Sequence, residues 1–419
     1  MKNKRAIIAL LFVSLLAGFI GCGKPSANRQ SSGSSDSSFW ARSWNPSSST
    51  EAGGQPFQSQ GGQNIALLLP FKGAHAKAAY AILDGFLAAY YQDTQGQFPG
   101  AAIRVYDTSL ASASSLYQKA ASDGASFVVG PLTKKEVQAV AGLRHLPVPT
   151  LALNSISNSR SSEQFFQFAL SPEEETEALA ERVFKAGHKR ALILVPKSDW
   201  GKRMNAAFSK AWHQEGGVIA ETYWAEAGPG LSEEIKTFLQ VNDRRARELG
   251  KVRTGALKSS DPRRRHDFDV IILATSTELA RQIRPLLNFY YAGHLPIYGS
   301  SSIYSGIPDI SKDLDLNGVI FSDMPGILDK RYMTAEVNQA WHSLWPNQPA
   351  SSIRLFMMGM DAYQLIQSLP NLRNGSNSFT GRSGILSLDE QGHLHRKLIW
   401  AQIRHGQAEL IHEDPEQPR

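Results

Sequence analysis

The sequence predicts an α/β protein of two successive halves, each a mostly parallel sheet flanked by helices. Residues 127–153 have the pattern of a strand, a helix and a second strand, a unit whose two strands must be parallel. The same alternation of short apolar runs and amphipathic stretches extends from residue 63 to about residue 300. With 419 residues, 42% of them hydrophobic, the chain has enough apolar material for two ordinary cores.

The unit at residues 127–153 sets the pattern. A β-branched and aromatic run at 127–129 is closed by a Gly-Pro pair, which indicates a strand that ends abruptly. Thr133 and Glu136 form a capping box, so a helix is expected to begin there. Residues 147–153 form the next strand. Ligands of such sheets bind beyond the C-terminal ends of the strands, where this chain carries small, polar and basic residues.

The other elements follow in chain order. The first half has extended segments at 65–69, 103–106 and 165–169, and helices at 74–91 and 112–122. The second half has strands at 191–195, 218–223 and 270–273, and helices at 172–186, 200–215 and 232–249, with caps at Ser171 and Ser232 and a further cap at Thr275. Short strands at 296–298 and 319–322 and a helix at 352–369 come next. Residues 385–412 are predicted to form an antiparallel meander, an appendage on one lobe.

These elements define the expected domains. The boundaries are 1–21 for a signal segment, 22–62 for a tether, 63–169 plus 297–370 for lobe 1, 170–296 plus 371–412 for lobe 2, and 413–419 for a tail. The tether holds twelve serines and six glycines with few aliphatic residues between 23 and 62, a composition that cannot bury enough apolar surface to order itself.

The N-terminal segment predicts secretion and lipidation. Positive residues precede an apolar run at 6–20, which is shorter than the roughly 20 residues of a spanning helix. Cys22 is the only cysteine, and its context resembles the lipobox at which bacterial lipoproteins are cleaved and acylated. An aspartate directly after the cysteine resembles a signal for retention in the inner membrane. The residue at this position is Gly23, which favours the outer membrane. The alternative is a plain signal peptide or an inner-membrane anchor with an idle cysteine.

Positive charge is concentrated in one segment. Residues 244–266 hold nine Lys or Arg against two acids, a net charge of +7, whereas the chain without residues 1–21 carries only +3. We expect an exposed insertion that contacts an anionic surface such as phospholipid, lipopolysaccharide or glycan. The residues expected to make this contact are Arg244, Arg245, Arg263, Arg264 and Arg265. A solvated loop without a partner is an equal alternative.

Eight stretches in a fixed order carry a family resemblance. They are IALLLPF at 65–71, VYDTS at 105–109, DGASFVVGPL at 123–132, LALN at 151–154, FALSPEEE at 168–175, LVPKS at 194–198, MGMDAYQL at 358–365 and SGILSLDEQGHLHRKLIWAQIRHGQ at 383–407. Their order resembles the type 1 periplasmic-binding-protein fold, with two α/β lobes joined by three crossings. Within that superfamily they are similar to the C-terminal domain of the penicillin-binding-protein activators, the LpoA or LppC family of outer-membrane lipoproteins. Longer members carry an N-terminal helical-repeat domain where this chain has the Ser-rich tether, so no role of that domain is carried over.

The resemblance implies a function without catalysis. We expect a lipid-anchored protein on the periplasmic face of the outer membrane that binds and stimulates a class A penicillin-binding protein, the peptidoglycan synthase. Peptidoglycan or anionic lipid are further expected contacts, and nucleic acid is not. The alternative is a solute-binding lipoprotein of an ABC transporter, with an amino acid, a peptide or a muropeptide as ligand.

A crevice between the lobes is the candidate binding site, because loops at the strand ends converge there. The candidate residues are Lys72, Asp107, Thr108, Lys134, Asn154, Ser155, Lys197, Ser198, Thr275, Ser300 and Ser301. Residues 299–306 offer hydroxyls and no carboxylate, so a zwitterion would be poorly served and an anionic or sugar-like ligand is expected. The alternative is that the lysines are solvated surface residues.

Catalytic motifs are absent from the sequence. It has no GxxxxGK[ST], GxSxG or HExxH motif, and it lacks the Ser-x-x-Lys and Lys-Thr-Gly set of penicillin-binding enzymes. His393 and His395 alternate on one predicted strand without a third ligand, so they are read as surface residues. We therefore expect no enzymatic activity, no cofactor and no metal.

Overall fold

The structure is a computed structural model that describes residues 63–93, 102–157, 163–242, 263–335, 337–338, 341, 350–373 and 378–411. The expectations for the signal segment, Cys22, the tether, Arg244, Arg245 and the tail lie outside these residues. Within them, no helix is both long and apolar enough to cross a bilayer.

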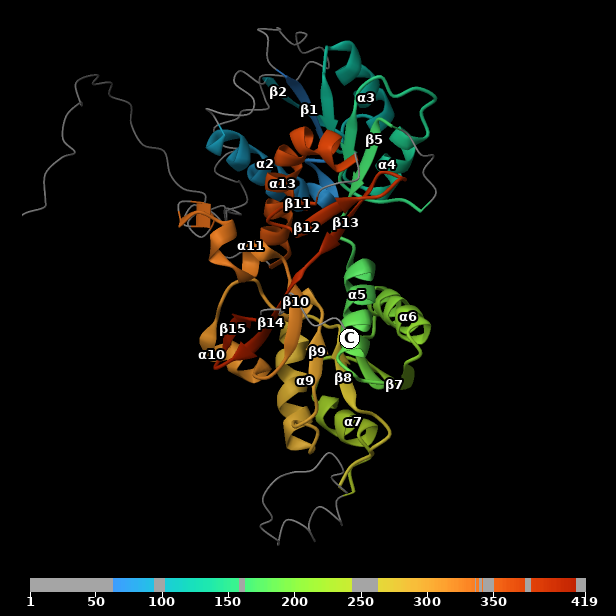
Figure 1. The fold of residues 1–419 in the computed structure, drawn as a ribbon, viewed down its shortest axis with the longest axis vertical. Helices are drawn as coiled ribbons and strands as arrows, with labels where there is room; N and C mark the ends of the chain where they lie inside the picture. Colours follow the sequence, from blue (N-terminus) through green and yellow to red (C-terminus); the bar gives the residue numbers. More distant parts are fainter. Residues whose placement is uncertain are drawn as a thin grey trace, which may run out of the picture. The chain divides into compact units, whose positions relative to one another are not determined.

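The first sheet has the strand order β11-β12-β13-β5-β4-β3-β1-β2 (Figure 1). Its strands are β1 (Asn64–Leu69), β2 (Ala102–Asp107), β3 (Phe127–Val129), β4 (Thr150–Ala152), β5 (Phe165–Phe168), β11 (Phe379–Thr380), β12 (Ile385–Leu388) and β13 (His393–Lys397). Strands β1 to β5 are parallel, and β13 adds to β5 in parallel. The pairs of β11 with β12 and β12 with β13 are antiparallel.

The second sheet has the order β15-β14-β10-β9-β8-β6-β7. Its strands are β6 (Arg190–Pro196), β7 (Val218–Ala225), β8 (Val270–Leu273), β9 (Ile297–Gly299), β10 (Ile320–Asp323), β14 (Ile399–Arg404) and β15 (Gln407–Leu410). Strands β6 to β10 are parallel, whereas β14 and β15 are antiparallel to their neighbours. The expected fold class is therefore confirmed.

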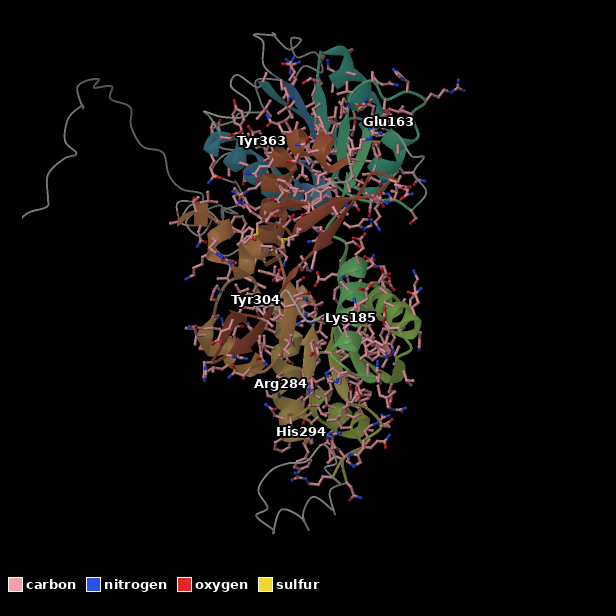
Figure 2. All side chains as sticks on the ribbon, in the orientation of Figure 1. Glu163, Lys185, Arg284, His294, Tyr304 and Tyr363 are labelled. Carbon is pink, nitrogen blue, oxygen red and sulfur yellow. The ribbon has the colours of Figure 1, made fainter. Side chains whose placement is uncertain are left out.

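Helices flank both sheets (Figure 1). In the first half they are α2 (Ala76–Gln92), α3 (Ala113–Ser122), α4 (Lys134–Ala141) and α13 (Ala350–Arg373). In the second half they are α5 (Pro172–Lys185), α6 (Asp199–Gln214), α7 (Leu231–Phe238), α9 (Thr277–Phe289), α10 (Ile310–Asp313) and α11 (Pro325–Leu328). Figure 2 shows Tyr363 among the helices beside the first sheet and Arg284 and His294 in the half that holds the second.

Sheet membership corrects the expected lobe boundaries. Residues 297–323 were expected in lobe 1, but β9 and β10 extend the second sheet because β9 pairs with β8 in parallel. The meander was expected on one lobe, yet it is shared: β13 pairs with β5 in the first sheet and β14 with β10 in the second. Within the described residues, the chain therefore passes between the sheets three times, after β5, β10 and β13.

Helix caps decide several local boundaries. Thr133 and Glu136 form the predicted capping box of α4, and Ser171 caps α5 with Pro172 at its first turn. Two predicted caps are wrong. Ser276 rather than Thr275 caps α9, and the N-cap of α7 is Gly230. Ser232 lies inside α7, and its hydroxyl is within hydrogen-bond distance of the Tyr290 hydroxyl.

The core of the first half depends on the close approach of α2 and α13. A Cβ on Gly85 would lie 1.8 Å from the carbonyl oxygen of Phe356, and one on Gly359 would lie 2.1 Å from that of Ile82. Both glycines therefore let the helix backbones touch. Side chains from α2, α13 and β1 share one apolar cluster there. This packing fixes the position of α13, whose N-terminal half carries Arg354 toward the second sheet.

Candidate functional site

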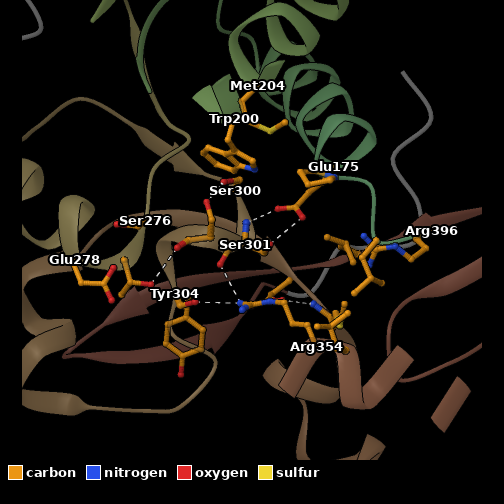
Figure 3. Close-up of a pocket in the computed structure, with 18 residues that line it drawn as sticks. Glu175, Trp200, Met204, Ser276, Glu278, Ser300, Ser301, Tyr304, Arg354 and Arg396 are labelled. Carbon is orange, nitrogen blue, oxygen red and sulfur yellow. Dashed lines mark hydrogen bonds and ion pairs between the residues drawn. The ribbon is translucent and has the colours of Figure 1, made fainter. Parts of the chain in front are cut away.

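A cavity of about 450 Å³ lies at the C-terminal ends of β8, β9 and β10 (Figure 3). Such a volume falls within the range of small-molecule sites, about 300 to 1,000 Å³. Both halves of the protein contribute to it. The lining residues are Leu170, Pro172, Glu175, Trp200, Met204, Ser276, Thr277, Glu278, Ser300, Ser301, Ser302, Tyr304, Asp323, Met324, Arg354, Leu355, Arg396 and Leu398.

Arg354 connects α13 to the strand and loop residues that line this pocket. Its Nε donates to Oδ1 of Asp323 at 3.0 Å, and its Nη2 donates to Oδ2 of the same carboxylate. Nη2 also donates to the carbonyl oxygens of Ser301 and Tyr304, at 3.0 and 3.1 Å. Burial alone would lower the pKa of Arg354, but the charge of Asp323 raises it overall, so the pair is ionic.

Glu175 makes a second polar contact in the pocket. It stands in the first turn of α5, and its Oε2 accepts a hydrogen bond from the Ser301 hydroxyl at 2.9 Å. Its Oε1 accepts from the backbone N–H of Ser301. Burial raises the pKa of Glu175 above its ordinary value, although the bonds from Ser301 act in the opposite direction. Ser301 is therefore held by α5 on one side and by Arg354 on the other.

Arg396 differs from these two groups. Its Nη1 donates to the carbonyl oxygen of Ser383 at 3.1 Å, but its Nε is buried and has no acceptor in the described structure. Burial lowers the pKa of Arg396, while nearby carboxylates, Glu175 first among them, raise it. A buried donor without an acceptor costs about 1 to 3 kcal/mol.

The structure brings together few of the predicted site residues. Of the candidates, all of which it describes, Ser300 and Ser301 line the pocket, and buried Thr275 lies next to it because its carbonyl accepts from Ser302 at 2.8 Å. The remaining eight do not line it: Lys72, Asp107, Thr108, Lys134, Asn154, Ser155, Lys197 and Ser198.

Several of these eight have local roles. Asp107 accepts from the backbone N–H of Phe71 at 3.1 Å, and Asn154 donates to the carbonyl of Leu132 at 3.0 Å. Ser198 caps α6, and Lys197 pairs with Glu226 at 3.6 Å on the surface. Lys72 and Lys134 are exposed. These contacts account for their positions without a ligand.

Sequence reasoning missed the charged residues of the pocket. Residues 299–306 offer hydroxyls as expected, but carboxylates reach the pocket from elsewhere, because Glu175 and Asp323 line it from α5 and the end of β10. Glu175 and Arg354 fell within predicted helices, at 172–186 and 352–369, and neither was expected at the site. An arginine near the start of an otherwise apolar helix was the available signal.

The basic segment is also corrected at two positions. Arg264 is only 4% exposed, and its guanidinium donates to the carbonyls of Tyr291 and Arg265 at 2.9 and 2.6 Å. Arg265 is engaged by Asp267 and Glu221. Neither guanidinium is available to an anionic surface, because each is neutralised or bonded within the chain. Arg263 lies over the ring of Tyr291, with 3.8 Å between its guanidinium carbon and the ring centroid.

The histidines of β13 pair with carboxylates. The Nε2 of His395 lies 2.9 Å from Oδ2 of Asp389, and its Nδ1 lies 3.8 Å from Glu174 of α5. The Nδ1 of His393 lies 3.6 Å from the same Asp389 oxygen. Through His395, β13 of the first sheet contacts α5 of the second half.

Two mostly parallel sheets linked by three crossings, with a pocket at the strand ends between them, define the class of type 1 periplasmic-binding-protein-like proteins. Within this class, the family model described as LppC putative lipoprotein matches residues 55–406, and the chain belongs to that family.

Curated relatives and solved structures agree with this family membership. A protein of Photobacterium profundum named penicillin-binding protein activator LpoA is 33% identical over 346 residues, which cover 81% of this chain and 55% of that protein. The chain thus spans about half the length of the curated relatives it matches. The C-domain of LpoA (YraM) from Haemophilus influenzae, titled a regulator of PBP1A, has a TM-score of 0.65 at 25% identity, covering 83% of this chain and all of that one. The fold is shared by the structure of a putative branched-chain amino acid ABC transporter from Chromobacterium violaceum. Its TM-score is 0.61 at 23% identity, covering 81% of this chain and all of that one.

Proposed function

We propose that this protein is a non-enzymatic lipoprotein that binds a class A penicillin-binding protein and stimulates transpeptidation in peptidoglycan synthesis. The observation that carries the proposal is the family match over residues 55–406, together with a 33% identical relative named penicillin-binding protein activator LpoA. The sequence contains no catalytic motif, which is consistent with a regulatory role.

A regulator without chemistry of its own acts through differential affinity. It must bind the active conformation of the synthase more tightly than the inactive one, and it shifts that equilibrium by no more than this difference. A coupling free energy of about 1 to 3 kcal/mol gives roughly 5- to 150-fold more of the active state. We expect an interface of ordinary size with a polar rim, since both partners also exist apart.

The anchor is a second part of the proposal. We assign lipidation to Cys22 and the location to the periplasmic face of the outer membrane, on the evidence of the lipobox-like sequence and of membership in a lipoprotein family. The test is metabolic labelling with a palmitate analogue. Label on the natural protein and none on Cys22→Ser supports the assignment, and label that survives the substitution overturns it.

The partner is tested by capture from solubilised envelopes. The bait is the full chain, and the matched control is a fusion of residues 1–62 to an unrelated folded protein, which keeps the anchor and tether and removes the α/β body. Recovery of a class A synthase, identified by mass spectrometry, with the full chain and not with the control supports binding by the body. Equal recovery with both baits assigns the contact to the anchor and contradicts the proposal.

A solute-binding lipoprotein of an ABC transporter is the second candidate. The pocket of about 450 Å³ at the strand ends favours it, since solute-binding proteins of this fold use the same region. Co-purification of a transporter permease in place of a synthase, together with micromolar binding of a small solute, would favour this candidate.

A further inference from the structure

The second sheet ends in a strand whose outer edge is open. β15 is the last strand in the sheet order, and among the described residues no strand pairs with its far side. The N–H of Ile411, just after β15, donates to the carbonyl of Trp400 in β14 at 2.8 Å. Backbone groups alternate in direction along a strand. The N–H and C=O groups of Ala408 and Leu410 therefore point away from the sheet.

Two exposed apolar side chains lie at the turn that leads into this strand. Ile310 of α10 is 51% exposed and Leu314 is 49% exposed. Because Leu314 continues the helical run of α10, the two residues stand four apart and share a face. This run touches the β14–β15 turn, since a Cβ on Gly406 would lie 2.2 Å from the carbonyl oxygen of Ile310 (Figure 1). We call β15, Ile310 and Leu314 the edge surface.

Charges of both signs border the edge surface. Lys312 pairs with Asp309 at 2.7 Å on α10, and Arg404 pairs with Glu409 at 3.6 Å on the hairpin. An apolar centre with a polar rim is the usual anatomy of a protein–protein interface. Because these rim charges pair with each other, the rim favours a protein partner over a highly charged polymer or membrane.

The following residues of the chain and a second copy both fit this edge poorly. Residues 412–419 contain two prolines and three acids, types that are depleted in strands, and proline has no N–H to donate. In the antiparallel register that pairs Ala408 with Leu410, a second copy would place two Glu409 side chains opposite each other. Like charges in that position destabilise a sheet. The edge surface therefore favours a different chain.

We propose that an extended segment of the class A synthase adds to β15 as a further strand and places an apolar side chain on Ile310 and Leu314. Backbone hydrogen bonds to Ala408 and Leu410 supply affinity in this mode of recognition, and the apolar contact supplies specificity. The inference rests on the proposed function, because it names the surface through which that partner binds.

The test measures binding of the purified cognate synthase to the full chain in detergent. Ala408→Pro replaces an outward N–H with a ring, a change that edge strands tolerate where the N–H faces solvent. It is expected to weaken binding at least about tenfold, whereas Ala408→Ser keeps the N–H and stays within about twofold. Leu314→Glu is expected to weaken binding about tenfold as well, because the contact would bury a carboxylate without a partner.

Two matched controls make the same changes elsewhere. Thr380→Pro lies on β11, the free edge of the first sheet, where the N–H of Gly381 donates to Gly384, so the N–H of Thr380 points outward. Leu110→Glu changes an apolar side chain that is 68% exposed in the first half. Both are expected to bind the synthase as the natural protein does. Melting curves of all variants establish that each is folded, and the exposed Leu314 keeps the test decisive if Ala408→Pro is not.

The outcomes separate this inference from the proposed function. Natural affinity in both Ala408→Pro and Leu314→Glu overturns the edge surface and leaves the proposed function intact. Loss in folded Ala408→Ser or in the two controls to the same degree also overturns it, and loss with Leu314→Glu alone overturns strand addition. A dimer of the chain that Ala408→Pro abolishes assigns the edge to a second copy and contradicts the proposal. If the natural protein does not bind the synthase, both the proposed function and this inference fail.

Discussion

Arg354 of α13 and Asp323 at the end of β10 form a buried ion pair that joins the two halves of the protein. The Nε of Arg354 lies 3.0 Å from Oδ1 of Asp323, and the carboxylate is fully buried. The same guanidinium holds the carbonyls of Ser301 and Tyr304. Arg354 therefore links the helix packed on the first sheet both to the end of β10 and to the loop that follows β9 in the second sheet.

Removing one member of this pair is expected to destabilise the protein strongly. Arg354→Met leaves the Asp323 charge buried without a partner, which costs about 3 to 5 kcal/mol in the free energy of unfolding. The double variant Arg354→Met with Asp323→Leu is expected to recover much of this loss, because no uncompensated charge remains. Urea unfolding of the full chain measures both. A single variant within about 1 kcal/mol of the natural protein would show that the pair is not a structural link.

The contact of α2 with α13 predicts a glycine effect. Gly359→Ala places a Cβ 2.1 Å from the carbonyl oxygen of Ile82, so the helices must separate, at a cost of about 1 to 3 kcal/mol or more. The matched control is Gly228→Ala, where no atom lies within 4 Å of the added Cβ. A lower melting temperature for the first variant alone supports the packing, and equal melting temperatures argue against it.

Glu175 predicts a pH dependence of stability. Its pKa is raised by burial above its ordinary value of 4.5, so the folded state binds this proton more tightly than the unfolded state does. Its contribution to stability is then greatest below pH 4.5 and falls as the pH rises through the folded pKa. Glu175→Gln is expected to gain stability relative to the natural protein over this same rise in pH. Urea unfolding from pH 4 to pH 8 measures the difference, and a constant or opposite trend would contradict the burial argument.

The basic segment predicts salt-dependent membrane binding. Exposed charges lose most of their attraction beyond a Debye length of about 8 Å at physiological salt. The test uses the full chain without its lipid, as the Cys22→Ser variant. Its binding to anionic vesicles is expected to weaken with added salt and with the further substitution Arg263→Glu. Lys134→Glu makes the same change of charge far along the chain and serves as the control. Binding that ignores salt, or that falls equally in both variants, rejects a specific contact by this segment.

The regular parts of the fold were predictable from sequence because local signals decide them. The strand at 127–129 and the capping box at Thr133 are set by neighbouring residues, and the structure confirms both. The lobe boundaries were not predictable, because sheet membership depends on pairing between distant strands. Nothing local in residues 385–412 says that β13 joins β5 while β14 joins β10.

Only a small part of the pocket lining could be predicted from the sequence. Ser300 and Ser301 follow β9, and the rule that ligands bind at strand ends was enough to find them. Arg354 and Arg396 come from a helix and from a strand far along the chain, so their arrival beside Ser301 depends on how α13 packs and where β13 pairs. Such contacts follow from the tertiary structure and leave no spacing in the sequence.

Cross-linking of lipid-linked peptidoglycan precursor by a class A synthase tests the central claim most directly. The full chain, added to its cognate purified synthase in detergent, is predicted to raise the cross-linked fraction in a manner that saturates with its concentration. The matched control is the fusion of residues 1–62 to an unrelated protein, which is predicted to have no effect. If the synthase neither binds the full chain nor changes its cross-linking across saturating concentrations, the assignment as an activator is wrong.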